Sequence, residues 1–161
     1  MPDDARVWIF GADRPLDPPQ REALLRGADA FLEGWHAHRQ PVIGARDLPH
    51  DQFLVIAADE RASGVSGCSI DSLFRTLKEL EGELGVTLLD GSRVWFVGRE
   101  GEIRTATRAE FRALAEAGEV DGSTRVFDNT VATVGALRGG HWERPMAESW
   151  HGRAFAAALN R

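Results

Sequence analysis

The sequence predicts an α+β fold, on three observations. Strand-like and helix-like segments follow one another as strand, helix, strand, strand, helix, strand over about residues 6–98. The apolar residues of the two helical segments recur at helical spacing, which is typical of amphipathic helices. The run "FLVIAA" is apolar throughout, which indicates a central strand. The order βαββαβ is that of the ferredoxin-like fold, so we predict such an N-terminal part followed by a small α+β C-terminal extension.

The first strand and first helix have clear boundaries. "RVWIFGAD" at 6–13 is rich in β-branched and aromatic residues and reads as a strand. Asp17 is a suitable N-cap, and Gln20 completes a capping box for the helix that follows. We expect Pro41 to end this helix. Its predicted apolar face consists of Leu24, Ala28, Phe31 and Trp35.

Residues 41–60 are expected to form a hairpin with its turn at "DLPHDQ". A second amphipathic helix should begin near Ser69 and end at Gly85, and a fourth strand is predicted at 92–98. We place a domain boundary between 1–91 and 92–161, although the strand at 92–98 could be shared and make one continuous domain.

The C-terminal extension reads as shorter elements. After a turn and short strand in "GREGEIRTA", Thr107 and Glu110 form another capping box, and Gly118 ends that helix. "STRVFDNTVATV" is a predicted strand with a turn at Asp128-Asn129, and the tail ends in a short alanine-rich helix.

Composition limits the partners. The net charge is −6, with 25 acidic against 19 basic residues, which argues against nucleic acid and membrane surfaces as obligate partners. The N-terminus has no signal-peptide pattern, and the single cysteine cannot form an internal disulfide. We therefore expect a cytoplasmic protein, for which a homodimer is left open.

Several motifs give the chain a family resemblance: "VWIFGADRPL", "GWHAH", "SGCSIDS", "VFDNTV" and "ESWHGRAF". They resemble a group of small uncharacterised bacterial proteins often labelled "ABC transporter ATPase". The family lends no catalytic residue. The label itself requires a P-loop, whose lysine and backbone amides hold phosphate, and no such string occurs here. We therefore reject the ATPase activity.

Residues 94–150 resemble a second group, the GYF-like modules of bacterial proteins. The likeness consists of an aromatic strand, a helix ending in Leu-x-x-x-Gly-Glu, a Thr-x-Val-aromatic strand and a late tryptophan. Gly-Tyr-Phe itself is missing, because the chain has no tyrosine. The resemblance therefore implies a fold and not the binding of proline-rich peptides.

The Gly/Ser loop before the second helix is the main candidate site. Cys68 should lie at or next to the N-cap, where unpaired amides and the helix dipole favour an anion or a thiolate. Ser66, Gly67 and Ser69 would then bind a small anion, with no nucleophile required. Alternatively, Cys68 is a small buried residue and the serines are caps.

A catalytic role for Cys68 needs a base. The candidates are His36 and His38, expected in the last turn of the first helix, with Asp71 in the first turn of the second helix to orient a histidine. The sequence does not decide whether either histidine reaches Cys68. No CxxC or HxxxH spacing supports a metal site, and we expect no cofactor.

Two hypotheses follow. The favoured one is a noncatalytic module that binds a small anion or a protein partner at the Gly/Ser loop. Asn129, Trp150 and His151, which belong to the family-like motifs, are further ligand-binding candidates. The alternative is a cysteine-dependent enzyme of acyl or thiol chemistry, with Cys68 as nucleophile and a histidine as base.

Overall fold

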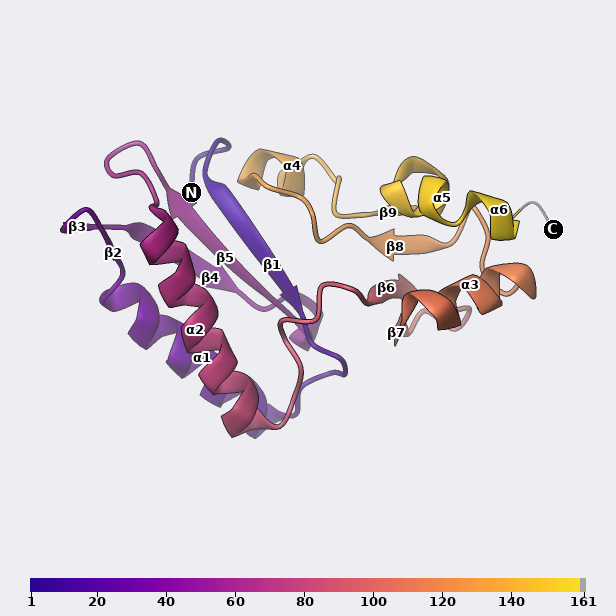
Figure 1. Ribbon diagram of the computed structural model, residues 1–161, viewed down its shortest axis with the longest axis horizontal. Coiled ribbons are helices and arrows are strands. Elements are labelled where there is room, and N and C mark those ends of the chain that lie inside the picture. Colours follow the sequence, from indigo (N-terminus) through magenta and orange to yellow (C-terminus); the bar gives the residue numbers. More distant parts are fainter. Residues whose placement is uncertain (160–161) are drawn as a thin grey trace.

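The computed structural model describes residues 1–159 and contains two main antiparallel sheets with helices packed on them (Figure 1). The strands are β1 (Arg6–Gly11), β2 (His36–Ala37), β3 (Gln40–Pro41), β4 (Ile43–Asp47), β5 (Phe53–Asp59), β6 (Val94–Val97), β7 (Ile103–Ala106), β8 (Arg125–Phe127) and β9 (Glu143–Pro145). The α-helices are α1 (Pro18–Glu33), α2 (Gly67–Leu84), α3 (Arg108–Glu116), α4 (Val134–Arg138), α5 (Trp150–Ala154) and α6 (Ala156–Leu159), with 3-10 turns η1 (Pro49–Asp51) and η2 (Met146–Glu148).

The first sheet has the order β1-β5-β4 and is antiparallel throughout. All seven residues of β5 are buried, as predicted for a central strand, because both of its faces are covered. The helices α1 and α2 cover one face (Figure 1). They run antiparallel, since the Gln20 side chain at the start of α1 reaches the carbonyl of Leu84 at the end of α2.

The mixed α+β class is confirmed, but the ferredoxin-like order is not. The antiparallel order β1-β5-β4 is that of the first three strands of a ferredoxin-like sheet, but such a sheet also has its fourth strand beside the first. The expected fourth strand, β6, does not join this sheet and instead pairs with β7 and β8 in a second sheet of order β7-β6-β8-β9.

The two sheets share an apolar interior. Val7 and Phe53 on the second face of the first sheet pack with Trp95 from β6 and Phe127 from β8. The indole Nε1 of Trp95 also donates a 2.8 Å hydrogen bond to the carbonyl of Ala12, directly after β1. The extension is therefore fixed against β1 by burial and by a buried hydrogen bond.

The predicted capping boxes at Asp17 and Thr107 are confirmed, whereas the second helix begins at Gly67 and not near Ser69. The side chain of Asp17 accepts from the amide of Gln20, and Thr107 does the same for Glu110. Ser66 and Ser69 form a comparable box at the start of α2. These local patterns place helix N-termini correctly because each needs residues only three positions apart.

Candidate functional site

Two backbone amides of the Gly/Ser loop are hydrogen-bonded to the loop's own serine side chains. The amide of Ser66 donates to Ser69 Oγ at 2.8 Å, and the amide of Ser69 donates to Ser66 Oγ at 3.2 Å. The helix begins at Gly67, which makes Cys68 its second residue, and the Cys68 side chain is exposed. The alternative of a buried cysteine is therefore wrong, whereas that of capping serines is confirmed.

The expected position of the two histidines is wrong. The helix α1 ends with Gly34 as C-cap and not at Pro41, so His36 lies in β2 and His38 in the turn that follows. The antiparallel helices do bring this segment to the start of α2, where Trp35 Nε1 donates to the carbonyl of Ser69 at 2.9 Å. Both histidines are exposed, and the Nδ1 of His36 contacts the carbonyl of Gly34.

A catalytic constellation is not assembled around Cys68. Within residues 1–159, no hydrogen bond joins its thiol to a histidine or a carboxylate. Asp71 is exposed and lies beyond the first turn of α2, because the helix starts two residues earlier than expected. No group of three His, Cys, Asp or Glu side chains suited to a metal ion occurs in the described chain.

The three candidates from the later motifs do come together. Asn129, Trp150 and His151 line a groove of about 430 Å³ beside β1, which we call the β1 groove. Its other lining residues are Arg6–Gly11, Phe74, Leu88–Gly91, Arg93, Trp95, Phe127 and Thr130–Ala132. These residues come from β1, from α2 and the connection to β6, and from the C-terminal extension.

Two buried donors in the β1 groove have no acceptor. Three tryptophans donate their indole N–H to identified oxygens, namely Trp35, Trp95 and Trp142, whereas the buried Nε1 of Trp150 has no partner in the described chain. The buried Nε of Arg93 also makes no hydrogen bond. Asp90 lies 3.4 Å from it, within ion-pair range but misaligned for a hydrogen bond.

The buried ring of His151 stacks on the indole of Trp150. Its ring is 1% exposed and stacks on the Trp150 indole with the ring centroids 3.8 Å apart. The Nδ1 of His151 lies 2.6 Å from Ser149 Oγ. Burial lowers the pKa of His151 to about 4, with a smaller opposing effect of Asp128, so the ring is neutral at pH 7.

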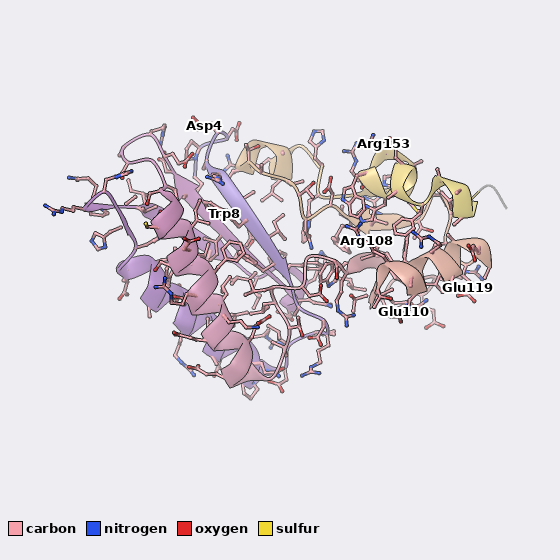
Figure 2. The ribbon with its side chains drawn as sticks, in the orientation of Figure 1. Asp4, Trp8, Arg108, Glu110, Glu119 and Arg153 are labelled. Carbon is pink, nitrogen blue, oxygen red and sulfur yellow. The ribbon has the colours of Figure 1, made fainter. Side chains whose placement is uncertain are left out.

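Arg108 also contacts Trp150. Its guanidinium lies 5.3 Å from the indole centroid, a cation–π distance, and Figure 2 shows it between α3 and α5. The indole therefore has two ring contacts, with His151 and with Arg108, which restrict its position.

A larger hollow, of about 630 Å³, lies between the β6–β7 hairpin and Ser123–Arg125. Its charged lining is balanced, with Arg99, Arg104 and Arg125 against Glu100, Glu102 and Glu119. Among residues 1–159, no buried polar side-chain atom without a hydrogen-bond partner belongs to its lining. We therefore consider the β1 groove the better candidate site, because its unpaired donors call for an acceptor.

Arg93 is not among the site residues predicted from the sequence. It stands directly before the apolar strand β6, and its partly buried guanidinium becomes evident only when β6 packs against β1. The one available signal was a charged residue at the edge of a core strand, which is common at strand ends.

In comparisons with protein-family models, curated proteins and solved structures, the chain matched none of them. No helix of the described chain combines the length and apolarity that crossing a membrane requires.

Proposed function

We propose that the protein is a noncatalytic binding module that holds a carboxylate-bearing ligand in the β1 groove. The observation that carries this proposal is that two residues lining one cavity, Arg93 and Trp150, each have a buried donor, Nε and Nε1, without a hydrogen-bond acceptor in the described chain. A carboxylate accepts several hydrogen bonds and favours a guanidinium partner.

The surroundings of the two donors fit such a ligand. Asn129 Oδ1 accepts the indole N–H of Trp142 at 2.9 Å, which orients the amide and leaves its nitrogen as a further donor beside the groove. The walls contributed by Phe74 and Leu88 are apolar. A hydrogen bond made between such walls is stronger than one made in water.

The Gly/Ser loop stays an alternative anion site, and the experiment below includes it. The amides of Ser66 and Ser69 already have acceptors, whereas Arg93 and Trp150 do not. The cysteine-dependent enzyme also stays a prediction. The exposed thiol of Cys68 is accessible, but the described chain provides no base in contact with it.

The proposal is tested by titrating succinate and, separately, phosphate into ¹⁵N-labelled protein. The five tryptophans give five indole N–H signals, and a Trp150→Phe variant identifies that of Trp150. We expect succinate to shift the Trp150 signal to saturation while the Trp35 signal, whose N–H is already bonded to Ser69, stays in place.

Arg93→Gln should remove the response, and the matched control is Arg75→Gln, because Arg75 is exposed on α2 and outside the groove. Shifts of the Gly67 and Cys68 amides in place of the Trp150 indole would show that the loop is the anion site and that the groove is not. An unchanged spectrum with both anions would contradict the proposal as a whole.

A further inference from the structure

The outer edge of β1 lies along the β1 groove. The amide of Val7 points away from β5 and donates to the carbonyl of Ala132 at 2.9 Å. The amide of Ala12 points the other way, toward β5, and donates to the carbonyl of Gln52 at 2.8 Å. Because backbone groups alternate between the two edges of a strand, Ile9 and Gly11 share the parity of Val7. Their amides therefore face the groove.

The chain itself covers only the first part of this edge. One isolated antiparallel bridge joins Arg6 to Thr133. If the residues before Thr133 continued in a straight strand, they would pair with the rest of β1. They turn away instead, because the side chain of Asp128 accepts from the amide of Thr130 at 3.0 Å and its carbonyl accepts from Val131 at 3.3 Å. Beyond the bridge, the edge at Ile9 has no strand partner in the described chain.

An unpaired strand edge is a template for an added strand. The opposite edge of the sheet, β4, carries the exposed charged residues Arg46 and Asp47, which discourage such pairing. The free part of β1 carries the side chains of Trp8 and Phe10 on one face and Ile9 on the other, between largely apolar walls. The β1 edge is thus the one suited to receive a strand.

Charge indicates what kind of strand fits. Arg6 and Arg93 line the groove with one acidic side chain, Asp90, which pairs with Arg93, while Arg6 also lies 3.9 Å from Glu60 outside the groove. The two residues whose buried donors lack a hydrogen-bond acceptor, Arg93 and Trp150, line the same groove. An extended segment bearing a carboxylate would complement both the backbone edge and these donors.

We propose that the ligand of the β1 groove is an extended, acidic peptide segment of a partner protein, which adds as a strand to the outer edge of β1 and places a carboxylate against Arg93 and Trp150. This inference rests on the proposed function and adds the class of partner to it.

The test uses a capped peptide, Val-Thr-Val-Thr-Val-Glu, and its Gln-ended counterpart, each measured by fluorescence anisotropy with the full chain. We expect the Glu peptide to bind roughly tenfold or more tightly than the Gln peptide, in line with a charge-assisted hydrogen bond, and Arg93→Gln to abolish the difference. Two N-methylated versions of the Glu peptide provide the matched control. Methylation of the amides of one parity should prevent binding, and methylation of the other parity should not.

Amide exchange of the protein provides a second readout. The Ile9 amide should exchange more slowly when the peptide is bound, whereas that of Phe10, which faces β5, should not change. If succinate binds but neither peptide slows exchange at Ile9, strand addition is wrong and the proposed function stands. If succinate and both peptides fail to bind, the proposed function is wrong as well.

Discussion

Lowering the pH from 7 to 4 should destabilise the protein through His151. Burial holds the pKa of this ring at about 4 in the folded state, against about 6.5 for an ordinary histidine. Between these values the unfolded chain binds a proton that the folded chain does not. The stabilising effect is therefore complete above about pH 6.5 and is lost as the pH falls toward 4.

The magnitude follows from the size of the shift. Each pH unit between the two pKa values changes the free energy of unfolding by about 1.4 kcal/mol, so His151 alone should account for about 3 kcal/mol. That is a large part of the 5–15 kcal/mol that typically stabilises a domain. The neighbouring charges are Asp128, which favours the charged ring, and Arg108, which opposes it.

The assay is urea unfolding at pH 7, 6, 5 and 4 of the wild type and of His151→Phe, which retains an aromatic ring beside Trp150 but cannot titrate. Loss of the Ser149 hydrogen bond destabilises this variant at every pH, so the informative quantity is the change of its difference from wild type with pH. The wild type should lose about 3 kcal/mol more than the variant. Equal losses, or an NMR titration that places the His151 pKa near 6.5, would refute the reasoning.

Three further outcomes are expected. Cys68, being exposed, should be alkylated by iodoacetamide in the native protein, as intact mass will show, and Cys68→Ser should change the free energy of unfolding by less than about 0.5 kcal/mol. Gly11→Ala should destabilise by about 1–3 kcal/mol in urea unfolding, because the added methyl would lie 2.5 Å from the Trp95 ring; a neutral result would contradict this packing. Ser66→Ala removes the cap of α2 and should lower the thermal midpoint, through a loss of about 1 kcal/mol, whereas an unchanged midpoint would show that the cap contributes nothing.

The sequence predicts those elements whose signals are local. Capping residues at Asp17 and Thr107 place helix starts correctly, and the continuous apolar run of β5 identifies the central strand. The partner of each strand could not be predicted in the same way, because strand pairing depends on residues far apart in the sequence. Nothing near Val94 indicates that β6 turns away from the first sheet.

The candidate site shows the same division. The predicted end of the first helix at Pro41 is wrong because the helix stops at Gly34, so His36 and His38 lie outside it. The β1 groove is formed by segments as distant as residues 6–11 and 150–151, so Trp150 could be predicted from its motif, but not the missing partner of its indole N–H. Arg93 in particular has no distinguishing sequence context.

The interior shared by the two sheets also bears on the order in which the protein can fold during synthesis. Val7 and Val55 are covered by Phe127 and Val134, which leave the ribosome much later. Until then, the nascent chain carries an apolar sheet face with nothing packed against it, although α1 and α2 can already cover the opposite face. A chain that stops after β6 would keep that face in water, and we expect it to require a chaperone or to aggregate.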